Sequence, residues 1–165
     1  MYINKIITGF CSMLLLFSSI VSASEDLIID ADNQDLDYKN NTLYFSGNVV
    51  VKQGSVTIKA DELFVITKEG NSDKLIAKGT PAIFSQKEQN NQELSAQALE
   101  ITYLVEAQVL QLAGSAKFQQ GGSVVESAKI EFDLKAQRVK AEGDESQNGR
   151  VTTRLKTKKI NTNIY

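Results

Sequence analysis

Acidic residues are the side chains of this 165-residue chain whose spacing could support chemistry. Asp30, Asp32 and Asp35 are spaced like part of a calcium-binding loop. Such a loop also needs a glycine at its sharp turn and a glutamate that closes the coordination shell, and the segment has neither. We therefore interpret these carboxylates as acceptors of local backbone hydrogen bonds where a strand ends.

Two pairs of carboxylates, Asp61 with Glu62 and Glu131 with Asp133, invite comparison with acid–base catalysts. Neighbouring residues of a strand point to opposite faces, which separates Asp61 from Glu62. Glu131 and Asp133 share a face, but it is the polar one, and a solvated surface accounts for both.

No histidine occurs in the chain, so no serine has an imidazole base. A serine–lysine dyad and a glycosidase-like pair of carboxylates stay open as alternatives, without a motif that supports either. We predict a protein that is not an enzyme, with no catalytic residue, no metal site and no cofactor.

Any functional side chain of this chain is expected to lie on strand-like segments, in which apolar and polar residues alternate, around four glycines. Each glycine follows a strand-like stretch, and a second alternating segment precedes that stretch across a polar turn. The glycines recur about every 30 residues, a spacing typical of stacked supersecondary units. Period-two alternation extends over residues 27–155, so we predict an elongated all-β scaffold with no significant helix. We expect the strands to stay flat and narrow at these glycines, which are Gly47, Gly79, Gly114 and Gly143.

The alternation also predicts one continuous apolar face. Small residues on it would leave space between two apolar sheets, and such space suits an acyl chain. A packed β core is the other explanation for most of the face. The small residues are Ala31, Ala60, Ala77, Ala116 and Ala141. The larger ones are Leu27, Ile29, Leu43, Phe45, Val49, Val51, Val56, Ile58, Leu63, Val65, Leu99, Ile101, Tyr103, Leu110, Leu112, Phe118, Ile130 and Phe132.

The single proline, Pro81, fixes how one strand is oriented. Proline cannot donate a hydrogen bond to a sheet, so it belongs at an edge or a bulge. A bulge shifts the alternation by one position, and we predict that it turns Phe84 rather than Ile83 toward the interior.

The N-terminus has the features of a secretory signal peptide. A positive Lys5 precedes a mostly apolar stretch, and Val21-Ser22-Ala23 offers small residues for cleavage after Ala23. An uncleaved anchor is the alternative, but the apolar stretch is short for a bilayer. We predict a signal over residues 1–23, a secreted β-domain over 24–156 and a flexible basic tail over 157–165.

The predicted mature chain has few reactive or strongly charged features. Cys11 is the only cysteine and lies in the signal, after Phe10 rather than the small residue that lipoprotein processing requires. Removal of Lys5 gives 17 − 20 = −3 charges, which argues against nucleic acid as a partner. The strand at Leu27-Ile28-Ile29 carries no proline or lysine to protect its edge. Open edges of this kind pair head to tail, and a repeated contact of that type makes an open filament.

Several segments, in order along residues 27–155, carry a resemblance to a known family. The most specific is Phe45-Ser46-Gly47-Asn48-Val49, and the others are residues 31–33, 36–37, 50–54, 58–61, 79–84, 114–116 and 150–153. They resemble the OstA-like family of periplasmic lipopolysaccharide-transport proteins. The resemblance implies a twisted, open β-jelly-roll of stacked antiparallel strands, whose two sheets enclose an apolar groove.

The resemblance also implies a function. Lipopolysaccharide would bind by its lipid A acyl chains and be carried across the periplasm for outer-membrane assembly. The implied partners are an LptC-like inner-membrane protein, an LptD-like outer-membrane translocon and the chain itself, head to tail. Family positions that contact lipid correspond to Leu27, Ile29, Phe84, Tyr103 and Val105. We combine these positions with residues of the apolar face. The predicted lipid-binding residues are Leu27, Ile29, Phe45, Val49, Val51, Ile58, Phe84, Ile101, Tyr103, Val105 and Leu112.

Two other classes of protein stay open. One is a structural or adhesive secreted β-solenoid with a filled core and no lipid ligand. The other is an envelope hydrolase that uses paired carboxylates.

Overall fold

The computed structural model describes residues 26–69, 71–87, 93–144 and 149–156, and over these ranges the chain is all-β. The predicted fold class is confirmed. No helix in the described ranges is long and apolar enough to cross a bilayer. The strands are β1 (Ile28–Asp30), β2 (Asn33–Asp37), β3 (Thr42–Gln53), β4 (Val56–Lys68), β5 (Asn71–Lys87), β6 (Glu93–Leu104), β7 (Val109–Gln120), β8 (Ser123–Asp133), β9 (Arg138–Glu142) and β10 (Thr152–Arg154).

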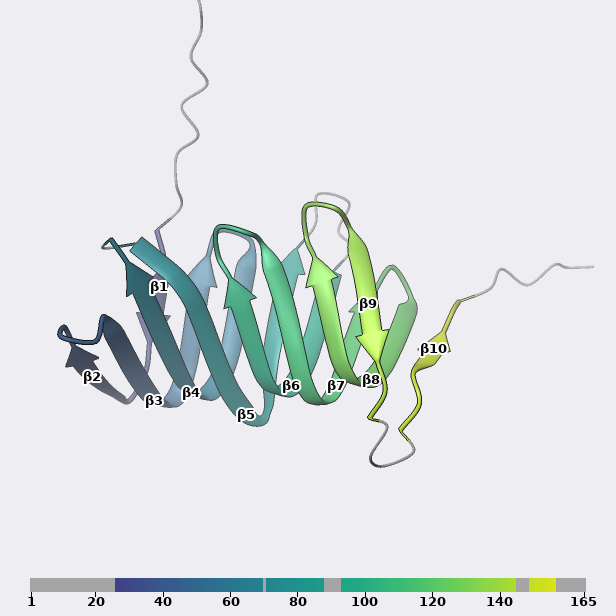
Figure 1. The fold of residues 1–165 in the computed structure, drawn as a ribbon, viewed down its shortest axis with the longest axis horizontal. Coiled ribbons are helices and arrows are strands. Elements are labelled where there is room, and N and C mark those ends of the chain that lie inside the picture. The colour runs from purple at the N-terminus through teal and green to yellow at the C-terminus, as the bar shows by residue number, and fades with distance from the viewer. Residues whose placement is uncertain (1–25, 70, 88–92, 145–148, 157–165) are drawn as a thin grey trace, which may run out of the picture.

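The strands form one antiparallel sheet that is folded into two layers (Figure 1). Each long strand, from β3 to β8, crosses from one layer to the other at a shift in pairing register. These shifts lie along one side of the molecule, which we call the fold line. The hairpin turns lie along the opposite, open side (Figure 1).

The two layers have different edge strands. The first layer starts at β1, which pairs with residues 50–52 of β3, and ends at β10, which pairs with residues 124–126 of β8. The second layer starts at β2 on the other half of β3 and ends at β9 on the other half of β8. Within the part of the chain that the structure describes, both layers therefore have an unpaired edge at each end.

Glycines lie on the fold line, and the strands bend at them rather than staying flat. Gly47 and Asn48 have φ of +80° and +48°, and Gly114 and Ser115 have φ of +78° and +49°. Such left-handed pairs insert an extra residue and bend the strand. The expectation that these strands stay flat is therefore wrong. Gly143 does not lie in a strand at all, because β9 ends at Glu142.

The prediction for Pro81 is confirmed. The pairing register of β5 shifts between Lys78 and Ala82. Beyond this bulge Phe84 is 0 % exposed, whereas Ile83 is 37 % exposed and faces outward.

Two residues assigned to the apolar face lie outside. Leu99 is 50 % exposed, because the register shift between Gln97 and Glu100 reverses the alternation and turns Ala98 inward instead. The Leu99 side chain lies over Gly114, on the outer surface. Ala31 is exposed in the short connection between β1 and β2, where no sheet covers it.

We expect Gly114→Ala to lower the free energy of unfolding by about 1–3 kcal/mol. Its φ of +78° disfavours a side chain, and an added Cβ would lie 3.0 Å from Leu99 Cδ1. Chemical unfolding followed by circular dichroism measures the loss. Gly54→Asn is the control, because Gly54 has φ of +55° in an exposed turn where asparagine is tolerated. Equal stability of the Gly114→Ala variant and the wild type would contradict this account of the fold line.

Candidate functional site

The space between the two layers is the candidate lipid site. The structure brings together eight of the predicted lining residues, which are 0–7 % exposed there: Phe45, Val49, Val51, Ile58, Phe84, Ile101, Tyr103 and Leu112. Leu27, Ile29 and Val105 are partly buried and pack against the margin of this core. The predicted set therefore lies on one connected interior surface.

Aromatic rings connect the two layers. The rings of Phe84, in the first layer, and Tyr103, in the second, have centroids 6.0 Å apart. Phe118 and Phe132 make a similar contact at 4.6 Å. Burial raises the pKa of Tyr103, so its phenol is neutral at physiological pH. The interior is therefore uncharged where the layers meet.

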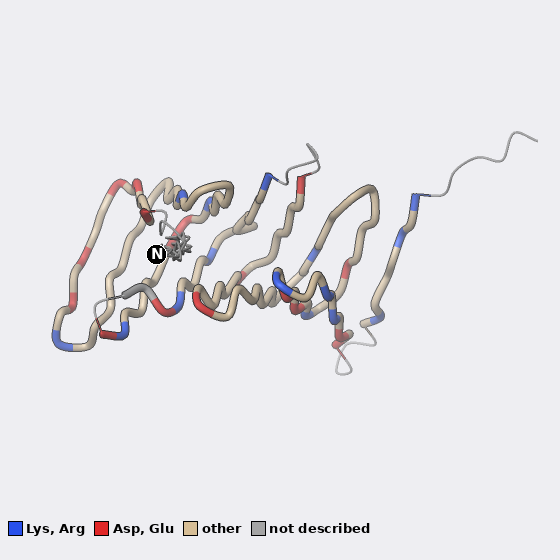
Figure 2. Tube along the Cα trace, turned by 90° about the horizontal axis from the view of Figure 1, so that it is seen from above, with Lys and Arg blue, Asp and Glu red and all other residues tan. Residues whose placement is uncertain are grey.

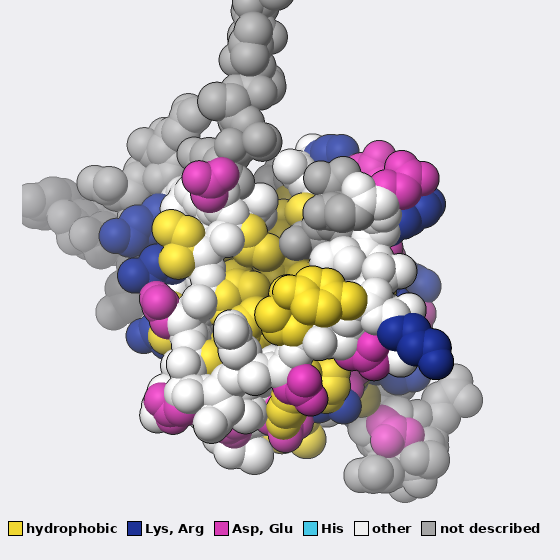
Figure 3. Space-filling view, turned by 90° about the vertical axis from the view of Figure 1, so that its left-hand side faces the viewer, with side chains coloured by type: hydrophobic (Ala, Val, Ile, Leu, Met, Phe, Trp, Pro, Cys, Tyr) yellow, Lys and Arg dark blue, Asp and Glu magenta, His cyan; other side chains and the backbone are white. Residues whose placement is uncertain are grey.

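No polar or charged residue is buried within the ranges that the structure describes. The interior continues from the β1 and β2 end of the molecule to the β9 end, where Val139 and Ala141 pack against it. At the N-terminal end, apolar side chains are visible between the two walls of the sandwich (Figure 3). The interior is thus an apolar path with an accessible end.

Side chains fill this path. Small residues that were predicted to leave space, such as Ala77 and Ala116, are buried against their neighbours at 0 % and 2 % exposure. The cavities described on the molecule lie elsewhere. One of about 260 Å³ is on the outer face of the second layer, beside Glu100, Gln111 and Lys129. A lipid chain between the layers would have to part them.

The open side offers a place where the layers can part. Backbone hydrogen bonds between neighbouring turns on this side stay within one layer, as in Val105 N to Asp73 O at 3.1 Å. A side-chain hydrogen bond does cross it: Gln120 Nε2 donates to Gln137 Oε1 at 3.0 Å. The covalent crossings between layers lie on the fold line, so separation at the open side leaves the strands intact.

Sequence reasoning missed part of the interior. Leu75 and Leu94 are buried, together with Ala82, Ala96 and Ala98. The alternation Leu94-Ser95-Ala96-Gln97-Ala98 was a usable signal, because β6 begins at Glu93 directly beyond a polar segment.

The paired carboxylates are engaged in structural contacts. Glu62 Oε1 accepts a hydrogen bond from the Tyr44 hydroxyl at 2.9 Å, which raises the pKa of that tyrosine. Glu131 Oε2 accepts from Gln111 Nε2 at 3.2 Å. Asp133 Oδ1 accepts from the Ala136 amide at 2.8 Å and closes the β8–β9 turn.

In the calcium-like segment, Asp32 contacts the first bulge of β3. Asp32 Oδ2 accepts from the Asn48 side-chain amide at 2.8 Å, and the Asp32 amide donates to Gly47 O at 2.9 Å. Its carboxylate thus braces the first bulge through the Asn48 side chain. Among the described residues, no group of three or more acidic, histidine or cysteine side chains has a metal-binding arrangement.

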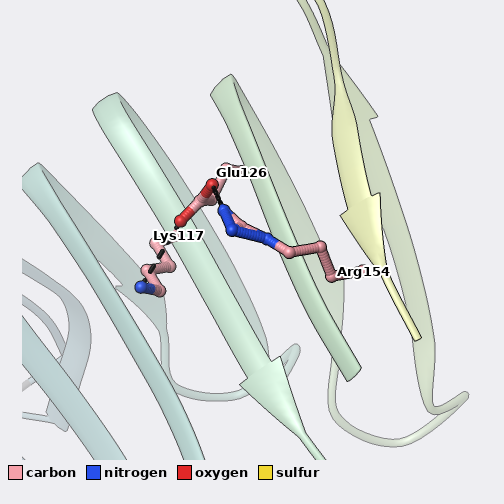
Figure 4. Close-up of polar contacts among 3 residues, drawn as sticks. All are labelled: Lys117, Glu126 and Arg154. Atoms are coloured by element: carbon pink, nitrogen blue, oxygen red, sulfur yellow. Dashed lines mark hydrogen bonds and ion pairs between the residues drawn. The ribbon is translucent and has the colours of Figure 1, made fainter. Parts of the chain in front are cut away.

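A cluster of charges holds β10 on the first layer (Figure 4). Glu126 lies on β8 and accepts a hydrogen bond from the Arg154 guanidinium on β10. Lys117 Nζ lies 3.4 Å from the same carboxylate. The Arg154 hydrogen bond, followed by Lys117, lowers the pKa of Glu126.

This lowered pKa predicts that acid loosens β10. A carboxyl whose pKa is lowered by folding stabilises the folded state above its ordinary pKa, and this effect is lost as the pH falls through the lowered value. We expect the amide NMR resonances of residues 152–154 to shift toward unfolded positions below about pH 4. The Glu126→Gln variant should show those positions already at pH 6. An unchanged β10 spectrum in that variant would contradict the role of the ion pair.

Comparison with known proteins agrees with this architecture. A family described as "LptA/(LptD N-terminal domain) LPS transport protein" matches residues 28–138. The lipopolysaccharide export system protein LptA of Haemophilus influenzae is 33% identical over 88 residues, which cover 53% of this chain and 50% of that protein. The chain thus spans about half the length of this curated relative.

A solved structure shows the same fold. It is the crystal structure of LptH from Pseudomonas aeruginosa, described as the LptA homologous periplasmic component of the conserved lipopolysaccharide transport device. It matches with a TM-score of 0.75 and 25% sequence identity, over 81% of this chain and 96% of that one. The family match covers more than half of the sequence, and the chain therefore belongs to the LptA/LptD N-terminal domain family of lipopolysaccharide-transport proteins.

Proposed function

We propose that this protein binds lipopolysaccharide by its lipid A acyl chains and passes it across the periplasm from the inner to the outer membrane, for outer-membrane assembly. Its proposed partners are an LptC-like inner-membrane protein, an LptD-like outer-membrane translocon and further copies of itself, head to tail. The similarity of the chain to the lipopolysaccharide export protein LptA and to LptH supports this proposal. The predicted signal at residues 1–23 and the tail at 157–165 lie outside the described residues and remain predictions.

The observation that carries the proposal is the apolar interior without a buried polar residue in the described ranges. Acyl chains that enter it leave water, at roughly 25 cal/mol for each Å² of apolar surface removed. The charged sugar and phosphate groups of the lipid would stay at the open side, in solvent. Leu27 and Ile29 would meet the acyl chains first, at the N-terminal end.

Entry of the lipid replaces contacts between the layers with contacts to acyl chains. Both sets of contacts are apolar, so the free energy of the interior changes little as the lipid advances. The strands bend at the fold line, which lets the open side widen without loss of sheet hydrogen bonds. Passage along such a path needs no bond-making step, and we propose no catalytic residue.

A second candidate follows from the filled interior. Because Phe84 and its neighbours leave little free volume, a structural β-solenoid without a ligand fits the same packing. The two functions differ in what accompanies the protein from cells.

Native mass spectrometry of the chain purified from the periplasm separates the two candidates. Under the transport proposal, a fraction of the molecules carries lipid A-containing species, and detergent removes them. Protein that is lipid-free in every preparation would favour the solenoid and overturn the transport proposal.

A further inference from the structure

The two ends of the molecule are complementary in strand number, strand length and strand direction. Each end presents one edge strand per layer: β1 and β2 at the N-terminal end, and β10 and β9 at the C-terminal end. β1 and β10 have 3 residues each, and β2 and β9 have 5 each. Every neighbouring pair is antiparallel along β1-β3-β4-β5-β6-β7-β8-β10, so the first and last of these strands point in opposite directions. The same alternation holds from β2 to β9.

A second copy that follows along the long axis therefore continues both layers. Its β2 would pair with β9, and its β1 with β10, and both pairs would be antiparallel. In the described part of the chain, β2 pairs only with β3 and β9 pairs only with β8, so the outer edge of each strand is available for pairing.

Charge distinguishes the two ends. Residues 26–37 contain five aspartates and no lysine or arginine, and Figure 2 shows acidic positions (red) along the N-terminal end of the molecule. The exposed positions of β9 are Arg138, Lys140 and Glu142. On β2, Asp35 and Asp37 occupy the outward positions, because Leu36 between them is partly buried. Opposite charges on facing strands stabilise their pairing, and like charges oppose it.

We propose that these charges set both the direction and the register of the contact between copies, with Arg138 opposite Asp37 and Lys140 opposite Asp35 of the next copy. This inference rests on the proposed head-to-tail function. The register aligns the two strands over their full length. It also places Val139 opposite Leu36, so that an apolar pair continues the interior from one copy to the next.

Other registers form fewer opposite-charge pairs. A slip of one residue places Val139, which points inward, opposite a residue of β2 whose side chain points to the outer face of the sheet. A slip of two residues in one direction keeps one opposite-charge pair, Lys140 with Asp37, but it places Glu142 opposite Asp35 and Arg138 opposite Lys39, which are two like-charged pairs. The opposite slip of two residues places Arg138 opposite Asp35 but leaves Lys140 facing Asn33, so one of the two opposite-charge pairs is lost.

The charges of β9 already have partners on one side. Arg138 lies opposite Asp133 of β8, and Lys140 lies opposite Glu131. Lys140 Nζ also lies 2.7 Å from Glu142 Oε1 on its own strand. The aspartates of the next copy would flank these cations from the other side, which extends a ladder of alternating charge across the junction.

Charge reversal tests the inference. In sedimentation velocity at low salt, we expect Arg138→Glu with Lys140→Glu to weaken self-association about tenfold, and Asp35→Lys with Asp37→Lys to do the same. The variant with all four changes, and the equimolar mixture of the two double variants, should regain association. Lys59→Glu with Lys87→Glu is the matched control, because it makes the same change of net charge at exposed sites away from β9. Normal association of the first double variant, or no recovery in the fourfold variant, would overturn the inference.

A disulfide reports the register directly. The predicted mature chain has no cysteine, and directly opposed residues of paired strands are close enough for a disulfide. We expect Leu36→Cys with Val139→Cys to form covalent oligomers, and Leu36→Cys with Ala141→Cys to form few. The reverse result would overturn the proposed register.

Bound lipopolysaccharide is measured on the same samples, so that the two proposals fail separately. Dissociated variants that still carry lipid support the charged junction as distinct from the lipid site. If wild-type protein assembles but never carries lipid, the transport function is overturned. The disulfide experiment still tests the proposed register in that case.

Discussion

Replacing Phe84 by alanine is expected to lower the free energy of unfolding by about 3–5 kcal/mol. Phe84 is 0 % exposed in the first layer, and its ring faces Tyr103 of the second layer across 6.0 Å. The change removes a large apolar side chain and leaves a cavity where the two layers meet. Chemical unfolding followed by circular dichroism measures the loss.

Ile83→Ala is the matched control for that measurement. Ile83 is the next residue of the same strand, is 37 % exposed and faces outward, so its removal should cost about 1 kcal/mol or less. A larger loss at Ile83 than at Phe84 would contradict the bulge at Pro81, which sets the direction of both side chains.

Replacing Ile29 by aspartate is expected to reduce the lipopolysaccharide bound per chain about tenfold, because a carboxylate at the mouth of the path would have to lose water beside an acyl chain. Ile29 pairs with Val51 and packs against the margin of the core. Its partial burial lets the fold survive the change, which a thermal melt would verify. Lipid is quantified after purification from the periplasm.

Ile28→Asp provides the comparison. Ile28 lies on the same strand but is 55 % exposed on the outer face, so its carboxylate would remain solvated. We expect normal lipid content in this variant. Equal lipid in both variants would exclude the inner face of β1 as part of the lipid path.

The sequence predicted the strands well because period-two alternation survives wherever one face of the sheet is buried. Leu43, Phe45 and Val49 follow one pattern on each side of Gly47, and the structure places β3 over that whole stretch. The proline signal was equally informative, because a residue without an amide hydrogen permits few positions in a sheet.

The bulges limited what alternation could predict. At Leu99 nothing in the local sequence marks a shift, since Ala98 and Leu99 are both apolar and either one could face inward. The partner strand determines the outcome, because Gly114 leaves room for the Leu99 side chain on the outside. Contacts of this kind join residues far apart in the chain and are absent from a local pattern.

The sequence also could not predict how closely the layers pack. Small residues such as Ala77 suggested free volume, yet the distance between layers adjusts until the side chains meet. The candidate site is therefore an apolar interior that side chains fill, and lipid binding requires the layers to part.

Photo-crosslinking in living cells tests the central claim most directly. A photoreactive amino acid would replace Phe84 or Tyr103 in the interior, and Lys59 on the outer face, in separate strains. The account predicts lipopolysaccharide adducts at Phe84 and Tyr103 and none at Lys59. Adducts at Lys59 alone, or none at either interior position in a folded protein, would contradict it.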